Sequence, residues 1–208
     1  MSAGKSSGPD WEARYAGEEA PFGETPIDYL RMALARSDAP KSGRALFLAD
    51  GDGRNGSWAS TQGFQVTGVD ISRVGTGRAT IRDMKADIPA RRIIGDIREW
   101  RPREGERFDL ITLFYLQGPP ELRFAAFPWL GEVLSPGGWL AIEGFAKTGD
   151  APVGMGPGRD DLRWSLAETL PHLAGLDVVE ALEGDIRLAD GPRHDGMAHV
   201  MRILARKA

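Results

Sequence analysis

The chain of 208 residues is predicted to adopt an α/β fold: a doubly wound, mostly parallel sheet of seven strands with helices on both faces. Short apolar runs of strand length alternate with stretches of helical periodicity, and glycine or aspartate follows most of these runs. Strands that alternate with helices form parallel sheets with right-handed crossovers. Two extended stretches in succession at the end of the chain indicate a C-terminal antiparallel hairpin.

The strands are expected where apolar residues run without interruption, because a parallel strand is buried on both faces. The expected parallel strands are 45–49, 64–69, 92–94, 108–114 and 139–143, and the closing hairpin joins strands near 176–186 and 197–206.

Helices are expected between these runs. An amphipathic stretch that begins at Ile27 opens the pattern. Further helices are predicted after the glycine turn up to Gly63, over 72–86, from near 119 to 134, and around 161–173. The residues Ser135-Pro136-Gly137-Gly138 are expected to end the fourth of these.

The composition excludes several classes of protein. The absence of cysteine removes disulfides, thiolate nucleophiles and cysteine-based metal sites, and the three histidines have no metal-ligand spacing. A formal charge of −4 argues against a nucleic-acid binder, and acidic residues interleave with the arginines at 91–103. The opening MSAGKSSGPD lacks the apolar run of a signal or anchor, and no later run could span a membrane. We therefore expect a cytoplasmic monomer of one domain, 1–208, in which 1–26 form a flexible N-terminus and lid.

The turn after the first strand reads Ala49-Asp50-Gly51-Asp52-Gly53-Arg54-Asn55-Gly56. Gly51-x-Gly53-x-x-Gly56, with Asp70 nineteen positions after Gly51, matches the fingerprint of dinucleotide binding. A pyrophosphate over this turn would face the carboxylates of Asp50 and Asp52, which is unfavourable in a partly desolvated site. A cofactor with a sulfonium and an ammonium group, such as S-adenosylmethionine, would be attracted to them.

Two further acids follow strands. Asp70 after the second strand would take both ribose hydroxyls, since a carboxylate offers two acceptors side by side. Asp96 after the third strand would accept a hydrogen bond from the adenine amine, with Ile97 packed on the ring. The alternatives for these residues are a helix N-cap at Asp70 and a turn residue at Asp96.

The run ALFLADGDGRNGSWASTQGFQVTGVDIS resembles the cofactor-binding motif of class I S-adenosylmethionine-dependent methyltransferases. Trp11-x-x-x-Tyr15 with Pro21-Phe22-Gly23 and Pro26, the stretches GGWLAIEGFA and GPGRDDL, and the closing DGPRHDGMAHVMRILARK are similar to the small tellurite-resistance and thiopurine branch of this family. The resemblance covers nearly the whole chain and implies a Rossmann-like fold.

The resemblance also implies roles for particular residues. Ala49, Gly51 and Gly53 would approach the cofactor through their backbone, Asp70 would hold the ribose with Ile71 beside the adenine, and Asp96-Ile97 would hold the base. The family often has Phe-x-His-Leu-Pro after the fourth strand, whereas this chain has Phe114-Tyr115-Leu116-Gln117-Gly118-Pro119. Gln117 near the expected histidine puts a histidine-assisted proton transfer in doubt and leaves the acceptor open.

The candidate site therefore has two parts and no metal. The cofactor-binding candidates are Ala49, Asp50, Gly51, Asp52, Gly53, Asn55, Asp70, Ile71, Asp96, Ile97 and Phe114. The substrate and lid candidates are Trp11, Tyr15, Phe22, Tyr115, Gln117 and His194, with further contacts expected from the loop 144–158. No catalytic residue is assigned.

The first hypothesis is a methyltransferase acting on a small-molecule thiol, amine, hydroxyl or metalloid, with S-adenosylhomocysteine (SAH) as the other product. Methyl transfer from a sulfonium is an in-line displacement that needs alignment and exclusion of water but no protein nucleophile. The alternatives are a domain that binds S-adenosylmethionine without catalysis and an NAD-type oxidoreductase. The lack of Asn/Asp-Pro-Pro-Tyr after the fourth strand disfavours methylation of nucleic-acid bases.

Overall fold

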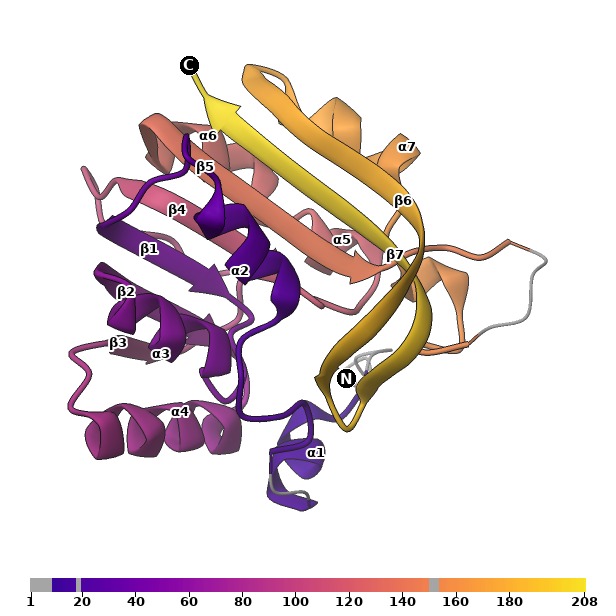
Figure 1. The fold of residues 1–208 in the computed structure, drawn as a ribbon, viewed down its shortest axis with the longest axis horizontal. Coiled ribbons are helices and arrows are strands. Elements are labelled where there is room, and N and C mark those ends of the chain that lie inside the picture. Colours follow the sequence, from indigo (N-terminus) through magenta and orange to yellow (C-terminus); the bar gives the residue numbers. More distant parts are fainter. Residues whose placement is uncertain (1–8, 18–19, 150–153) are drawn as a thin grey trace, which may run out of the picture.

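A seven-stranded sheet of order β3-β2-β1-β4-β5-β7-β6 forms the centre of the protein in the computed structural model, which describes residues 9–17, 20–149 and 154–208 (Figure 1). The strands are β1 (Gly43–Leu48), β2 (Phe64–Asp70), β3 (Arg91–Ile94), β4 (Phe108–Phe114), β5 (Leu134–Phe145), β6 (Leu176–Gly191) and β7 (His194–Lys207). β1 to β5 pair in parallel, and β7 is antiparallel to both β5 and β6. The predicted fold class is confirmed.

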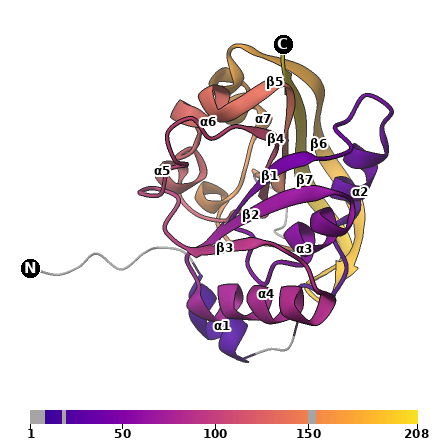
Figure 2. The same cartoon turned by 90° about the vertical axis from the view of Figure 1, so that its left-hand side faces the viewer.

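Helices cover the sheet on both faces (Figure 2). They are α1 (Trp11–Gly17), α2 (Asp28–Ala35), α3 (Arg54–Thr61), α4 (Arg73–Ala86), α5 (Pro120–Arg123), α6 (Phe127–Val133) and α7 (Leu166–Thr169), with 3₁₀ turns at Asp160–Leu162 and Leu170–Leu173. The predicted flexibility of the N-terminus falls largely on residues 1–8, which lie outside the described residues.

Two apolar cores result from the alternation of side chains along the strands. Leu46 and Leu48 of β1 pack in the core that also contains Trp129 and Leu130 of α6. Ala45 and Phe47 point the other way, into the core that contains Tyr29, Leu30 and Leu34 of α2. Successive residues of a strand face opposite sides, so the uninterrupted apolar run of β1 serves both cores at once.

Two of the predicted helices are wrong. The helix expected from 119 to 134 is divided into α5 and α6, because Pro128 has no N–H to donate and its ring clashes with a continuing helix. The helix expected around 161–173 is interrupted by an extended segment at Trp164, which exchanges backbone hydrogen bonds with Phe145 and Lys147. Trp164 is buried and donates from Nε1 to the Leu116 carbonyl at 2.9 Å, so tertiary packing overrides the helical pattern there.

The sheet reverses its winding between β1 and β4, which are neighbours. Ala49 and Tyr115 follow these two strands, and both have positive φ, 58° and 51°. Residues other than glycine rarely adopt this conformation. Hydrogen bonds hold each turn: Ala49 N–H donates to Val69 at 2.8 Å, and Tyr115 N–H donates to Glu143 at 2.7 Å. Ligands of such sheets bind beyond the strand ends at this reversal.

Candidate functional site

A cavity of about 370 Å³ lies at the carboxyl ends of β1, β2 and β4. This volume is in the range of small-molecule sites. The predicted cofactor residues that line the cavity are Ala49, Asp50, Asp52, Asn55, Asp70, Ile71, Asp96, Ile97 and Phe114. The predicted substrate and lid residues that line it are Trp11, Tyr15, Phe22, Tyr115, Gln117 and His194. The structure thus brings together side chains spread over most of the sequence.

Two predicted residues, Gly51 and Gly53, do not line the cavity. The hydroxyl of Tyr15 lies over Gly51 at the place that a Cβ would take. Gly53 has φ +78°, and a Cβ there would lie 2.6 Å from the Ala79 Cβ and 3.0 Å from the Arg92 Nη2. Both glycines therefore allow close packing in this structure. The expected approach of their backbone to a cofactor remains a prediction.

Asp70 ends β2 with its carboxylate already fixed. One oxygen accepts from Gly51 N–H and the other from Ser72 N–H, each at 2.8 Å. Burial raises the pKa of Asp70, and these two backbone hydrogen bonds oppose that rise. Each carboxylate oxygen can accept more than one hydrogen bond. A vicinal diol at this position could be bound by a carboxylate whose orientation the backbone has set in advance.

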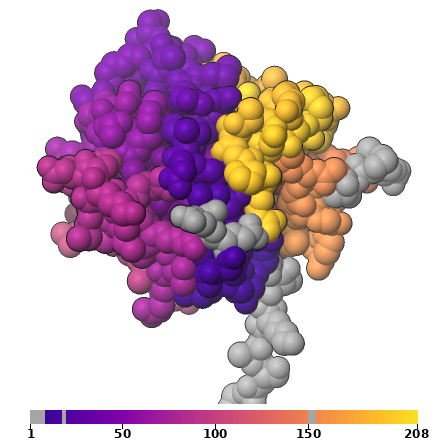
Figure 3. All heavy atoms as spheres, turned by 60° about the horizontal axis from the view of Figure 1, so that its bottom comes forward, coloured from indigo at the N-terminus to yellow at the C-terminus, as the bar shows by residue number. Residues whose placement is uncertain are grey.

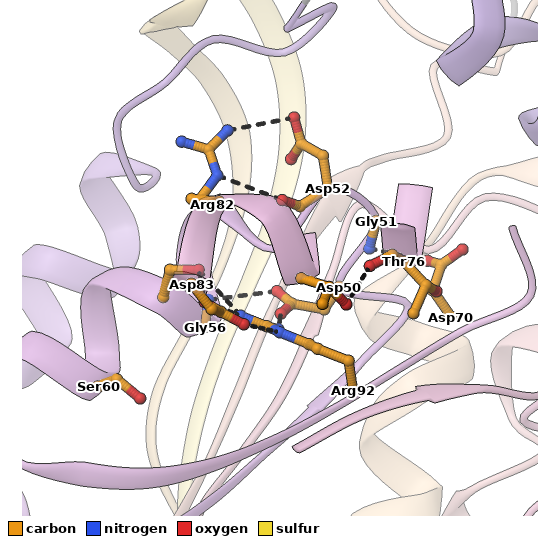
Figure 4. A network of polar contacts seen from close by, with 12 residues as sticks. Asp50, Gly51, Asp52, Gly56, Ser60, Asp70, Thr76, Arg82, Asp83 and Arg92 are labelled. Carbon is orange, nitrogen blue, oxygen red and sulfur yellow. Dashed lines mark hydrogen bonds and ion pairs between the residues drawn. The ribbon is translucent and has the colours of Figure 1, made fainter. Parts of the chain in front are cut away.

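Asp52 also faces the cavity, and two arginines lie near it. Its Oδ2 lies 3.6 Å from Arg82 Nη2 (Figure 4), and Arg54 is a second nearby cation. Burial raises the pKa of Asp52, whereas both arginines lower it. An additional positive charge in the cavity would stabilise the ionised form of this buried carboxyl.

Asp50 departs from the expectation that its charge faces the cofactor. Although it borders the cavity, its Oδ2 is ion-paired with Arg92 (Figure 4). Arg92 also binds Asp83 at 2.7 Å and the Ser57 hydroxyl at 2.9 Å. Burial raises the pKa of Asp50 to about 7, and Arg92 opposes the rise. The electrostatic argument for a cationic cofactor consequently rests on Asp52 and Asp70.

Asp96 closes β3 and is held by Arg98. The guanidinium of Arg98 contacts both carboxylate oxygens, and its backbone N–H donates to Oδ1 at 2.9 Å. The hydrogen bond from the Arg98 side chain lowers the pKa of Asp96. Ile97 beside it is buried, whereas Ile71 across the cavity is 54% exposed. These two isoleucines offer apolar surface to a planar base.

Aromatic rings also line the cavity. The rings of Trp11, Tyr15 and Phe22 lie 6.2–6.4 Å apart, centroid to centroid. The ring of His194 lies 5.2 Å from Phe22 and 4.1 Å from Tyr115. Burial lowers the pKa of His194 to about 3, with a smaller effect from Arg54. This imidazole is therefore neutral at physiological pH.

Sequence reasoning missed two charged residues of the site, Arg54 and Arg98, both of which line the cavity. No local pattern marks Arg54, because the carbonyls that it binds lie 29 to 136 residues away in the sequence. The loop 144–158 was expected to contribute and does not line the cavity in its described parts, 144–149 and 154–158. Residues 150–153 lie outside the described residues.

Two further properties concern the described part of the chain. Its histidine and acidic residues form no group of three that could hold a metal ion. None of its helices is long and apolar enough to cross a membrane.

The cavity fits S-adenosylmethionine in the chemistry of its side chains. The carboxylates of Asp52 and Asp70 suit a cation and a diol, and isoleucines flank the place expected for a base. A pyrophosphate would face the same two carboxylates in a low dielectric, which is unfavourable. The charge pattern therefore separates the two cofactors that the glycine spacing alone leaves open.

Comparisons with known proteins agree with this geometry. Residues 45–138 match the family model described as a methyltransferase domain. Among solved structures, TehB from Haemophilus influenzae is similar with a TM-score of 0.70 at 20% identity, over 87% of this chain and 62% of that one. The chain thus spans less than two thirds of the length of TehB. No curated protein sequence matches the chain significantly.

Two further structures are similar over most of both chains. One is described by the conversion of a disulfide bond into a thioacetal group during echinomycin biosynthesis, with a TM-score of 0.70 and 21% identity over 95% of this chain and 90% of that one. The other is an S-adenosylmethionine-dependent methyltransferase from Clostridium acetobutylicum, with a TM-score of 0.65 and 12% identity over 87% and 90%. Identities this low establish the shared fold.

The fold, the strand-end acids and the match of residues 45–138 to a methyltransferase domain support one class of enzyme, the class I methyltransferases that depend on S-adenosylmethionine. Residues 45–138 match the methyltransferase domain of this class, whose cofactor is S-adenosylmethionine.

Proposed function

We propose that the chain, as one domain of 208 residues, transfers a methyl group from S-adenosylmethionine to a small-molecule acceptor. One observation carries the proposal: the same cavity is lined by buried carboxylates and by a wall of aromatic rings. Its volume of about 370 Å³ and its covering by Trp11, Tyr15 and Phe22 favour a small acceptor over a macromolecule. The same N-terminal residues support the tellurite-resistance and thiopurine branch.

The buried carboxylates would hold the cofactor. Asp70 would accept hydrogen bonds from the ribose hydroxyls, Asp96 from the adenine amine, and Asp52 would lie nearest the positive charges. When bound, S-adenosylmethionine supplies an electrophilic methyl group on a sulfonium sulfur. The protein's own contribution is to orient the two reactants and to exclude water from between them.

The aromatic wall would hold the acceptor. Phe22, Tyr115 and His194 present apolar ring surface, which removes water from the nucleophilic atom. Because His194 is neutral, it adds no positive charge opposite a sulfonium. An acceptor with a polarisable lone pair in an apolar surrounding suits this wall, and the similar structure from echinomycin biosynthesis is described by chemistry at a disulfide. Thiols are therefore the first class to test.

The first experiment is a thermal-shift titration with S-adenosylmethionine, SAH and NAD⁺, on the wild-type protein and on Asp70→Asn. A ligand at a hundred times its Kd stabilises the folded state by about 2.7 kcal/mol. In a chain of this length that corresponds to a Tm increase of about 5–10 °C. Asp70→Asn should lose most of the increase, whereas Asp38→Asn on the surface should keep it. Stabilisation by NAD⁺ and not by SAH would refute the proposed cofactor.

Catalysis is tested separately by SAH release with a panel of thiols, amines, hydroxyl compounds and metalloid oxyanions. Turnover with one class identifies the acceptor. Tight SAH binding without release on any acceptor would instead support the non-catalytic alternative.

A further inference from the structure

Arg54 has an unusual place for a charged side chain. It is the first residue of α3, directly after the left-handed Gly53, and it is 5% exposed. Gly53 belongs to the turn 49–56, which we call the cofactor turn. The Nη1 of Arg54 donates to three backbone carbonyls: Phe22, Thr25 at 3.2 Å and Asp190 at 2.5 Å. Burial lowers the pKa of Arg54, and the carboxylates of Asp190 and Asp52 raise it.

These carbonyls belong to two segments far apart in the sequence. Phe22 and Thr25 lie in the lid loop, which we define as residues 20–27, and Asp190 lies at the tip of the β6–β7 hairpin. Figure 3 shows the indigo N-terminal segment lying against the yellow C-terminal segment. A single guanidinium at the start of α3 therefore joins the cofactor turn, the lid loop and the hairpin.

The backbones of the lid loop and the hairpin are in direct contact. Gly23 has φ +94°, and a Cβ there would lie 2.7 Å from the Asp190 carbonyl oxygen. Gly191 has φ +144°, and a Cβ there would collide with the Phe22 carbonyl. These two glycines thus let the lid loop and the hairpin approach closely enough for one arginine to bind both segments.

Neighbouring hydrogen bonds hold the end of the same loop. Asn55 Oδ1 accepts from Ile27 N–H at 3.0 Å, and Asp190 Oδ1 accepts from Asp28 N–H at 2.9 Å. The lid loop is therefore attached to the start of α3 and to the hairpin at both of its ends.

The aromatic wall depends on this arrangement. Phe22 comes from the lid loop and His194 from the first residue of β7, and their rings lie 5.2 Å apart at the cavity. Arg54 binds the backbone of Phe22 itself and the other strand of the hairpin that carries His194. A displacement of its guanidinium would move both rings.

We propose that Arg54 is a positioning residue that couples the cofactor turn to the aromatic wall of the cavity, by holding the lid loop and the hairpin against the start of α3. This inference rests on the proposed function, because the coupling matters only if a cofactor occupies the turn. Binding of the cofactor then restrains the acceptor wall as well.

Hydrogen exchange measured by mass spectrometry, with and without SAH, tests the coupling. In the wild-type protein, SAH should slow exchange about tenfold in the turn 49–56, in 20–28 and in 188–196, in the range of measured coupling effects. Arg54→Lys keeps the charge, but the lysine side chain is one bond shorter, so its ammonium nitrogen cannot take the place of Nη1 among the three carbonyls. In this variant SAH should still protect 49–56, whereas 20–28 and 188–196 should change less than about twofold.

Arg163→Lys is the matched control. Arg163 is 1% exposed and also binds three carbonyls, those of Ala146, Met155 and Pro157 at 2.8–3.0 Å, but it does not line the cavity. Arg163→Lys should keep the protection of 20–28 and 188–196 by SAH, even where the substitution lowers Tm. Gly23→Ala, which separates the lid loop from the hairpin without touching Arg54, should reproduce the Arg54→Lys result.

The outcomes separate this inference from the proposed function. Loss of remote protection in Arg54→Lys and Gly23→Ala, with retention in Arg163→Lys, supports the coupling. Retention in Arg54→Lys, or equal loss in Arg163→Lys, overturns it while SAH binding still supports the proposed cofactor. No protection by SAH anywhere in the wild-type protein overturns both.

Discussion

Arg92→Met is the sharpest test of how the cofactor turn is held in place. Arg92 is buried between the carboxylates of Asp50 and Asp83, and it also binds the Ser57 hydroxyl. Its guanidinium lies where a Cβ on Gly68 would be 2.5 Å from Nη1. Methionine would fill part of this space but would leave two carboxyl groups buried without a cation.

The expected loss follows from the burial of both carboxylates, whose side chains are only 3–5% exposed. Removing one partner of a buried ion pair costs about 3–5 kcal/mol. For a chain of this length the loss corresponds to a Tm decrease of about 6–20 °C. The same argument predicts a smaller effect for an exposed pair, about 0–1 kcal/mol.

The loss should also depend on pH. Burial already raises the pKa of Asp50, and without Arg92 nothing as strong opposes the rise. A carboxyl whose pKa is higher in the folded than in the unfolded state favours folding at low pH and loses that contribution as pH rises through the folded pKa. The destabilisation by Arg92→Met should therefore be largest at pH 8 and should shrink towards pH 5.

Urea denaturation of both proteins at pH 5, 6, 7 and 8 measures this difference. Arg98→Met is the control, since its pair with Asp96 is half exposed at the arginine. A loss below about 1 kcal/mol at pH 7, no larger than that of an exposed pair, would refute the reasoning. So would a loss that stays constant over the four pH values.

Two other contacts give predictions of different kinds. Burial lowers the pKa of His194 to about 3 in the folded protein, so between pH 7 and pH 5 only the unfolded chain takes up this proton. Lowering the pH from 7 to 5 should therefore reduce the free energy of unfolding by about 2 kcal/mol through this residue. In His194→Phe this part of the pH dependence should disappear, and equal slopes of unfolding free energy against pH would contradict it. Glu12 accepts from the Ser72 hydroxyl at 2.5 Å and from Val74 N–H at 3.2 Å. Glu12→Gln should speed amide exchange in α1 several-fold with little change in Tm, whereas unchanged exchange would show that other contacts hold α1.

The fold could be predicted because its strands are apolar on both faces and because glycine and aspartate mark their ends. These signals are local, so they survive without knowledge of the tertiary structure. The two interrupted helices depend on a proline and on a tertiary contact. Pro128 marks one of the two breaks in the sequence itself, whereas the position of Trp164 is fixed by the Leu116 carbonyl, 48 residues away.

The candidate site likewise has features that local sequence signals predict and features that depend on distant contacts. The position of Asp70 and Asp96 at the cavity could be predicted, because strand ends of a parallel sheet meet at one edge whatever their side chains contact. The direction of the Asp50 carboxylate could not be found, because it depends on Arg92, 42 residues further along the chain. The carbonyls bound by Arg54 lie 29 to 136 residues from it, and no spacing rule relates them.

The glycine spacing of this turn meets packing demands within the protein itself. In a dinucleotide site, glycines permit a tight turn, the approach of a pyrophosphate and close helix packing. Here Gly51 lies under the Tyr15 hydroxyl, while Gly53 and Gly56 leave room for the guanidinium of Arg92, each with Cβ positions 3.0 Å from one of its nitrogens. The same spacing thus accommodates an aromatic lid above the turn and a buried cation below it. Because steric demand alone produces the fingerprint in both cases, the charges around the turn, and not its glycines, indicate which cofactor it holds.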